Sequence, residues 1–234
     1  MKIYLVSTPI GNYDDITLRA LNTLKNSDLI VCEEYREARR LLSNYKIEKP
    51  LLSLNEHNEK ETAEEIVANI KNGKVVSVIS DCGTPLFSEP GHYLIEICIA
   101  DKIQIIPIPG AVSIIPALIA SGLDIEKFYY YGWLSPKKEV RKQELVKLKT
   151  LDELIILLDT PYRLKNLIES IIMVFGKNVP LVLAYQLTQK DEMFFRGDAE
   201  YILSKVIKQN LKGEFVLLLN NRSKRYKYKR SSTL

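Results

Sequence analysis

The chain has 234 residues, of which 46% are hydrophobic and 26% charged, and its formal net charge is +4 at pH 7. This length and apolar content are enough for one large or two small cores and exclude a disordered chain. Three cysteines, Cys32, Cys82 and Cys98, form no CxxC pair and leave an odd count, which argues against a disulfide framework and a zinc knuckle. We therefore expect a globular protein without a bound metal, in a reducing cytoplasm.

No membrane segment is expected. The first residues run straight into a strand pattern, with no apolar region typical of a signal peptide. The longest uncharged stretch, residues 103–123, has the length to cross a bilayer, but three prolines and Gly110 interrupt it.

The first half of the chain alternates strand patterns with amphipathic helix patterns. Strands are predicted at residues 3–6, 28–32, 75–79 and 103–106, and helices from Thr17, over 35–45 and from Thr62. The last helix has the clearest signals, because Thr62 and Glu65 form a capping-box pattern, apolar residues recur on one face, and Gly73 ends it.

Three loops that contain glycine follow these strands directly, at residues 7–12, 80–85 and 107–113. Glycine adopts backbone angles closed to other residues and lets a ligand approach the main chain, so α/β proteins often hold small molecules at such loops. Each loop alone is more typical of an ordinary strand-to-helix turn. The three together favour an enzyme.

The second half continues the alternation, with a long charged helix. Strands are predicted at 127–133, 154–158, 181–185, 192–196 and 214–219, and helices at 137–149, 162–175 and 199–209. The whole pattern predicts an α/β fold with a mostly parallel sheet and helices on its faces. We place a boundary near residues 113–124, between an N-terminal domain over 1–115 and a C-terminal domain over 122–221.

The last thirteen residues, 222–234, carry six basic and no acidic side chains, so the rest of the chain is net acidic. Like charges and the lack of an apolar period predict a flexible tail. Tyr226 and Tyr228 could stack on bases while the cations neutralise phosphates, as in a nucleic-acid-binding extension. A solvated, solubilising terminus explains the same composition.

Several short segments carry a resemblance to a known family. They are Thr8–Asn12, Asp15–Leu21, Glu56–Glu59, Ser80–Asp81 with Gly83–Pro85, Pro109–Gly110, Ser121–Leu123, Pro136–Lys138 with Arg141, Pro161 with Arg163–Leu164, Leu187–Thr188, Arg196–Gly197 and Lys212–Val216. In order and spacing they resemble the ribosomal small-subunit RNA methyltransferase I family, the 16S ribosomal RNA cytidine 2′-O-methyltransferases of the tetrapyrrole-methylase superfamily.

The resemblance implies a tetrapyrrole-methylase fold, with two α/β domains, an S-adenosylmethionine cleft between them, and usually a homodimer. It implies small-subunit ribosomal RNA or the 30S particle as partner. The cofactor contacts that it implies are Ile10, Gly11, Asp81, Gly83, Thr84, Val112, Ser113, Asp159, Ala184 and the loop at Lys212–Gly213. Backbone N–H groups and apolar walls of this kind suit a carboxylate and an adenine. Asp81 is equally typical of an Asp that satisfies its own turn.

Candidate substrate residues follow the second strand and precede the Thr62 helix. His57, beside Glu56, is the first choice for a general base or a ribose contact, although an ordinary loop histidine fits too. Glu33, Glu34 and Arg36 match an acidic pair and an arginine of the family, and Tyr35 stands where the family has a threonine. Arg36 could hold a phosphate or lie on a solvated helix face.

A cationic patch is also predicted. Its members are Lys137, Lys138, Arg141 and Arg163. These side chains could bind an RNA backbone, or they could form the solvated face of a helix.

Two segments depart from the family's pattern. The family's Glu-Ser-Pro-His-Arg reads Asp159–Arg163 here and loses its histidine, and its Arg-Glu-Leu-Thr-Lys reads Tyr185–Gln189 and loses its charges. Both segments lie where substrate is expected to bind, so the sequence predicts methyl transfer more firmly than it predicts the identity of the methyl acceptor. The alternatives are a precorrin-type tetrapyrrole methyltransferase acting on a small molecule, and a non-catalytic RNA-binding assembly protein.

Overall fold

The computed structural model describes residues 1–87 and 89–222, and these form two compact units that divide between Val112 and Ser113. Of the predicted tail, only Arg222 lies within the described residues. Its guanidinium donates to the carbonyl oxygen of Asp124 at 2.9 Å and lies 3.6 Å from the Asp124 carboxylate, so Arg222 belongs to the folded second unit.

Unit 1 is built on a five-stranded sheet in the order β3-β2-β4-β1-β5, and every pair in it is parallel. The strands are β1 (Lys2–Val6), β2 (Leu29–Cys32), β3 (Leu51–Ser53), β4 (Val76–Ile79) and β5 (Gln104–Ile108). All residues of β2 and β4 are buried, as expected for interior strands of a parallel sheet that helices cover on both faces.

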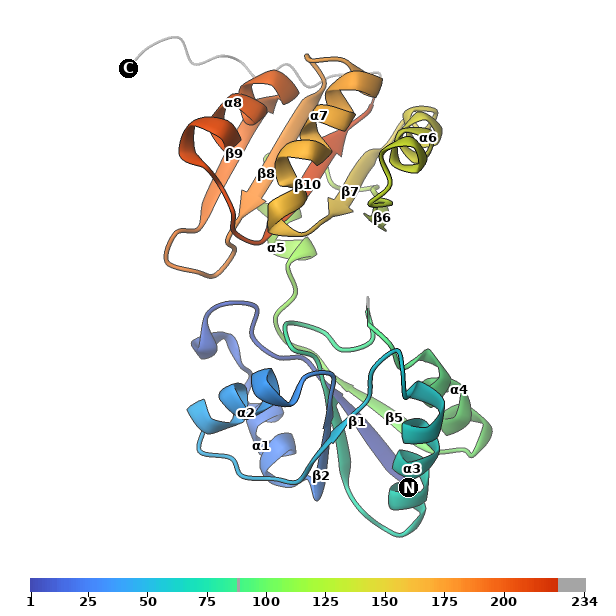
Figure 1. Ribbon diagram of the computed structural model, residues 1–234. Helices are drawn as coiled ribbons and strands as arrows, with labels where there is room; N and C mark the ends of the chain where they lie inside the picture. The colour runs from blue at the N-terminus through green and yellow to red at the C-terminus, as the bar shows by residue number, and fades with distance from the viewer. Residues whose placement is uncertain (88, 223–234) are drawn as a thin grey trace. The chain divides into compact units, whose positions relative to one another are not determined.

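The helices of unit 1 divide between the two faces of this sheet (Figure 1). They are the 3₁₀ turn η1 (Tyr13–Asp15), α1 (Leu18–Lys25), α2 (Tyr35–Asn44), α3 (Glu59–Lys71) and α4 (His92–Ala100). One core contains apolar side chains of α1 and α2, and a second core on the other face contains those of α3 and α4. In α2 the stripe is Ala38, Leu41 and Leu42, a helical spacing that turns one side to the sheet.

Unit 2 has a mixed five-stranded sheet in the order β6-β7-β10-β8-β9. Its strands are β6 (Tyr129–Trp133), β7 (Leu154–Leu158), β8 (Pro180–Tyr185), β9 (Met193–Asp198) and β10 (Phe215–Asn220). Only β6 and β7 pair in parallel, and the central β10 is antiparallel to both of its neighbours.

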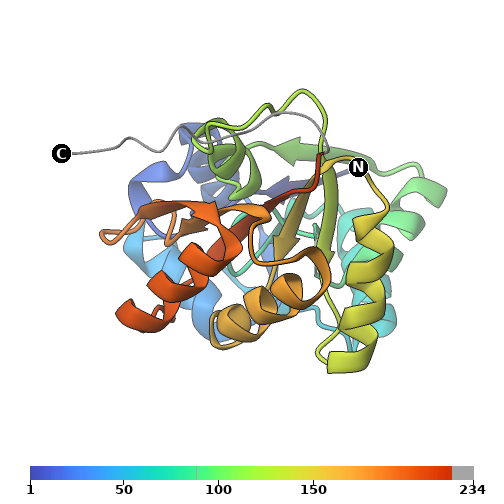
Figure 2. The same cartoon turned by 90° about the horizontal axis from the view of Figure 1, so that it is seen from above.

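The helices of unit 2 gather mostly on one face of that sheet. They are α5 (Ile114–Ile119), α6 (Lys138–Lys149), the 3₁₀ turn η2 (Pro161–Arg163), α7 (Leu164–Phe175) and α8 (Ala199–Gln209). Buried side chains of α6, α7 and α8 share one core with alternate residues of the strands, and Figure 2 shows these helices along the same side of the sheet. The short α5 contacts β10.

Two expectations from the sequence are wrong in detail. The mostly parallel sheet is correct for unit 1 but not for unit 2, where β8, β9 and β10 are antiparallel neighbours. The helix expected from Thr62 begins at Glu59, with Asn58 as its cap residue. The Asn58 side chain is used in the preceding loop, where it accepts from Asn55 N–H at 2.8 Å and donates to Ser53 O at 3.0 Å. Thr62 is buried inside the helix.

Candidate active site

The three glycine loops of unit 1 meet at the carboxyl edge of its sheet. Thr8, 1% exposed, links the first two loops: its N–H donates to Gly83 O at 2.8 Å, and its hydroxyl oxygen accepts from Gly83 N–H at 3.1 Å. The hydroxyl oxygens of Ser7 and Thr84 lie 3.1 Å apart. Ser7 N–H also donates to Ile108 O at 3.1 Å, at the entrance of the third loop.

The topology gives this edge a particular importance. Strands β1 and β4 are neighbours, yet β1 leads into α1 on one face of the sheet and β4 leads into α4 on the other (Figure 1). The loops after the two strands therefore diverge. In open α/β sheets a ligand binds outside the carboxyl ends of the strands at such a switch point.

Glycine is required where the loops approach one another. A Cβ added to Gly110 would lie 2.8 Å from the Ser7 Cβ, closer than two such atoms can pack. Gly83 has a φ of +87°, in the left-handed region, and its Cβ would lie 3.2 Å from Cγ2 of Ile10. The glycines therefore let the three loops pack more closely than any residue with a side chain would allow.

The other cofactor positions that the resemblance implies in unit 1 lie on the same loops. Ile10, Asp81 and Val112 are half-buried, and Gly11 and Thr84 are exposed. Asp81 does not serve only its own turn, because its Oδ1 accepts from the N–H of Glu34, 3.3 Å away, after β2. Ser113 follows at the start of unit 2, directly before α5.

Carboxylates are concentrated at this edge of unit 1. Burial raises the pKa of Glu33, and the nearby Asp81, Glu34 and Glu56 raise it further. Burial also raises the pKa of Asp81, with the Glu34 N–H bond opposing the shift. Glu89 behaves alike: burial raises its pKa, and its hydrogen bond with the Ser80 hydroxyl opposes the rise.

Glu33 and Glu34 form the acidic pair expected after the second strand, whereas Glu89 was not singled out in the sequence. The only signal for Glu33 is its position beside Glu34 after β2, and the structure distinguishes the two, because Glu33 is half-buried and Glu34 is exposed. Ser53, at the end of β3, holds the Glu33 backbone by donating its hydroxyl to Glu33 O at 2.8 Å. The sheet thus fixes the backbone at Glu33, whose half-buried carboxyl lies directly after β2.

The predicted substrate residues of unit 1 lie in the loops after β2 and β3. His57 is exposed, its side chain at 86%, and its Nε2 lies 3.5 Å from Oε1 of Glu56. The backbone N–H of His57 donates to Asn55 Oδ1 at 3.0 Å, so an Asx turn shapes the loop. Arg36 is exposed in the first turn of α2. His57 and Arg36 thus follow β3 and β2 at the carboxyl edge of the unit 1 sheet, the same edge as the glycine loops.

In unit 2 the implied cofactor residues also gather at one edge of a sheet. Leu158 of β7, Ala184 of β8 and Val216 of β10 stand side by side in register. Asp159 therefore follows β7 at the edge where the loop that contains Gly213 leads into β10, and Ala184 lies on the other side of β10. Tyr185 holds this loop, because its hydroxyl oxygen accepts from Gly213 N–H at 2.8 Å. The tyrosine that replaces a family arginine is thus buried and structural.

Asp159 is the most enclosed carboxylate of this edge. Its side chain is 1% exposed and its Oδ1 lies 3.2 Å from Nε of Arg163. Burial raises the pKa of Asp159, against the opposing effects of the Thr160 N–H and Arg163. Asp159 Oδ2 and Thr160 Oγ1 are buried without a hydrogen-bond partner among the described residues. Unsatisfied polar atoms of this kind fit a polar ligand.

The structure does not bring the predicted cationic patch together as one surface. Arg141 is 7% exposed and donates to the carbonyls of Ser135 and Pro136 at 3.1 and 3.0 Å. Arg163 donates to Ser135 O at 3.0 Å as well. Both guanidinium groups therefore hold the loop before α6. Lys137 and Lys138 remain exposed.

Among residues 1–87 and 89–222, no group of three or more His, Cys, Asp and Glu side chains has the arrangement of a metal site. The same part of the chain contains no helix with both the length and the apolarity needed to span a bilayer.

Comparisons with known proteins agree on one family. The chain matches the model of the Tetrapyrrole (Corrin/Porphyrin) Methylases over residues 2–202. Ribosomal RNA small subunit methyltransferase I of Thermotoga maritima is 37% identical over 221 residues, which cover 94% of this chain and 99% of the relative. The Bacillus subtilis protein of the same name is 36% identical over 217 residues, which cover 93% of this chain and 74% of the relative.

Solved structures share the fold at lower identity. Diphthine synthase superimposes with a TM-score of 0.71 at 15% identity and covers 94% of this chain and 90% of its own. A cobalt precorrin-4 methyltransferase of cobalamin biosynthesis has a TM-score of 0.69 at 18% identity and covers 94% of both chains. At these identities the likeness shows the fold alone.

Proposed function

We propose a function from the family to which this chain belongs, the ribosomal RNA small subunit methyltransferase I family of the tetrapyrrole methylases. In this proposal the methyltransferase modifies the 2′-hydroxyl of a cytidine ribose in small-subunit ribosomal RNA. The observation that supports a methyl-donor site most directly is the junction of the three glycine loops at the switch point between β1 and β4. The proposed donor is S-adenosylmethionine, which supplies a methyl group on a positively charged sulfur.

The residues of the two units fit such a donor. In unit 1 the proposed contacts are Ile10, Gly11, Asp81, Gly83, Thr84 and Val112, on the loops that the glycines allow to approach one another. In unit 2 they are Ser113, Asp159, Ala184 and Gly213. The unsatisfied Oδ2 of Asp159 and Oγ1 of Thr160 are polar atoms that a donor's hydroxyl or amino groups can satisfy.

The chain's part in the chemistry is mainly positioning. When the ribose oxygen forms its bond to the methyl carbon, the bond from carbon to sulfur breaks and the hydroxyl proton passes to a base. Holding the oxygen in line removes orientational entropy beforehand. Carboxylates around Glu33 favour a positively charged ligand nearby.

Two groups are proposed for the base. His57 is our first choice, because its exposed imidazole is available to a large substrate. Glu33 is the second, because burial and neighbouring carboxylates raise the pKa of its side chain and make it a better proton acceptor once ionised. Arg36 is proposed to hold a phosphate of the substrate, with Glu34 beside it.

Family membership also supports the remaining proposals. We propose the 30S particle or its RNA as partner, a homodimer, and a cytoplasmic location. A tetrapyrrole substrate is less favoured, because a solved precorrin-4 methyltransferase is 18% identical and a uroporphyrin-III methyltransferase 19%, whereas relatives named for ribosomal RNA are 37% and 38% identical.

The test is transfer of labelled methyl from S-adenosylmethionine to small ribosomal subunits from cells that lack this protein, followed by mapping of the label. Label on a cytidine 2′-oxygen is expected, and label on a base or a protein would overturn the proposal. His57→Gln should reduce the rate by about 100-fold or more, whereas His92→Gln, at the other histidine of the chain, should not. A full rate in His57→Gln with loss in Glu33→Gln would assign the base to Glu33.

A further inference from the structure

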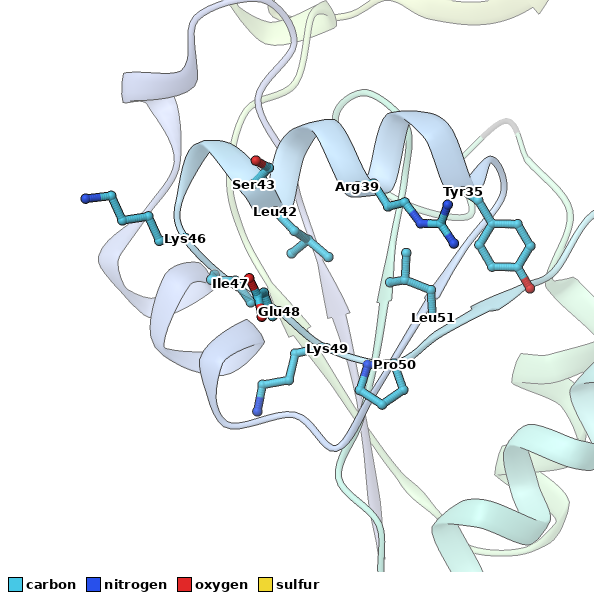
Figure 3. Close-up of a pocket in the computed structure, with 10 residues that line it drawn as sticks. All are labelled: Tyr35, Arg39, Leu42, Ser43, Lys46, Ile47, Glu48, Lys49, Pro50 and Leu51. Carbon is cyan, nitrogen blue, oxygen red and sulfur yellow. The ribbon is translucent and has the colours of Figure 1, made fainter.

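A groove of about 750 Å³ lies along α2, away from the glycine loops (Figure 3). Helix α2 forms one side, and the segment from Lys46 to Leu51, which leads into β3, forms the other. Leu42, Ile47 and Leu51 supply apolar surface between them. The groove belongs entirely to unit 1, and the site proposed above does not use it.

The groove concentrates positive charge in an acidic unit. Met1–Val112 contains 12 Lys and Arg against 16 Asp and Glu, whereas the segment 35–51 contains five basic and two acidic residues. Arg39, Lys46 and Lys49 line the groove together with one carboxylate, Glu48. None of these three cations forms a salt bridge within the part of the chain that the structure describes. They are therefore available to an anion.

Tyr35 forms an aromatic platform at one end. Its hydroxyl oxygen accepts from Ser53 N–H at 3.1 Å, which fixes the ring against β3, yet the residue is 42% exposed. The Arg39 guanidinium lies 5.7 Å from the ring centroid, and Figure 3 shows it extended toward the tyrosine. Lys46 and Lys49 lie at the other end of the same groove. Fixed aromatic rings with flanking cations are how proteins bind single-stranded nucleic acid.

The groove also begins next to the proposed methyl-transfer site. Tyr35 is the first residue of α2, directly after the loop of Glu33 and Glu34, and its hydrogen bond reaches the end of β3. A helix of ten residues is about 15 Å long, which is the length of a few nucleotides. A chain of RNA leaving the proposed site over the β2 loop would therefore run onto Tyr35 and then along α2.

We infer that this groove binds the single-stranded RNA that flanks the methylated nucleotide, with a base stacked on Tyr35 and phosphates at Arg39, Lys46 and Lys49. This inference rests on the proposed RNA substrate. It explains why the tyrosine, at a position where the family has a threonine, is fixed and exposed at once. Contacts to phosphates and stacking on a ring do not distinguish one base from another. The groove would therefore increase the affinity for RNA and position the strand, without selecting a sequence.

The experiment compares two triple variants of the full chain with equal loss of charge. Arg39→Gln/Lys46→Gln/Lys49→Gln removes the groove cations. Lys25→Gln/Lys74→Gln/Lys102→Gln removes three exposed lysines that precede β2, β4 and β5 and do not line the groove. Binding of unstructured small-subunit RNA is measured over a range of salt, together with methyl transfer to small subunits.

The groove variant should bind RNA at least tenfold more weakly and lower the slope of log K against log salt by up to about 2, since each single-strand phosphate contact contributes about 0.7. The lysine control should match the wild type. Equal behaviour of the two triple variants, with methyl transfer intact in the wild type, would overturn the groove and leave the proposed function standing. A wild type that neither binds nor methylates RNA would overturn both.

A second pair of variants tests the stacking. Tyr35→Leu should weaken RNA binding on the order of tenfold and leave heparin binding unchanged, because heparin has charges but no bases. Tyr35→Phe keeps the ring and should retain most of the RNA affinity. Equal RNA binding by Tyr35→Leu and the wild type would overturn the stacking part of the inference.

Discussion

Replacing Gly83 by alanine tests whether the glycine loops form the donor site. Gly83 has φ +87°, and Gly73, in the turn after α3, has φ +86°. Alanine in this left-handed region costs about 1–2 kcal/mol, so both Gly→Ala variants share that loss of folding free energy. Only at Gly83 does the new Cβ meet another group, at 3.2 Å from Ile10 Cγ2, whereas nothing lies within 4 Å at Gly73.

The extra contact should cost Gly83→Ala about 1 kcal/mol more than Gly73→Ala, because Ile10 must shift by a few tenths of an ångström. Urea denaturation gives the two free energies of unfolding, and titration calorimetry gives the affinity for S-adenosylmethionine. We expect the affinity to fall in Gly83→Ala and to stay at the wild-type value in Gly73→Ala. Equal stability losses and unchanged donor affinity in both variants would refute the assignment of this loop.

Three further variants probe the rest of the site. Arg163→Gln should lower the free energy of unfolding by about 3 kcal/mol, as measured in urea, because it leaves the Asp159 carboxylate buried without its partner. Burial raises the pKa of Glu33 above 4.5, so the folded state holds this proton longer than the unfolded state and stability falls as pH rises past 4.5. Glu33→Gln should therefore stabilise the protein at pH 8 and not at pH 4, and a gain equal at both would contradict this. Lys137→Gln/Lys138→Gln should lower the salt slope of RNA binding by about 1.4, and an unchanged slope would remove these lysines from the RNA-binding surface.

The edge of unit 1 was predictable because glycine leaves a signal in sequence. Loops with glycine after strands predicted a ligand edge, and the structure brings Gly83 and Gly110 into contact with Ile10 and Ser7. What the pattern does not contain is how the loops join. The Thr8 hydroxyl that links them looks like any other threonine in sequence, because its partner is 75 residues away.

In the second unit, a charged residue that the sequence pattern predicted to be exposed is buried. Residues 137–149 have the composition of a solvated helix, yet Arg141 is buried, because its guanidinium finds two carbonyls and the Ser170 hydroxyl, 3.1 Å from its Nε. Burial of an arginine depends on acceptors supplied by other segments, so no local period reveals it. The capping box predicted at Thr62 is wrong, because the helix begins three residues earlier. Its first turn contains Glu59 and Glu61, whose negative charges are favourable at a helix N-terminus.

The place of β10 in its sheet has a consequence for synthesis on the ribosome. All five strands of unit 1 are complete at Ile108, but unit 2 needs its middle strand, which ends at Asn220. At about 5–20 residues per second, roughly 5–20 s separate the two events. During that interval β6 and β7 on one side and β8 and β9 on the other have no strand to join them. The nascent second unit, with its apolar strands unpaired, is therefore the part of the chain that we expect chaperones to bind.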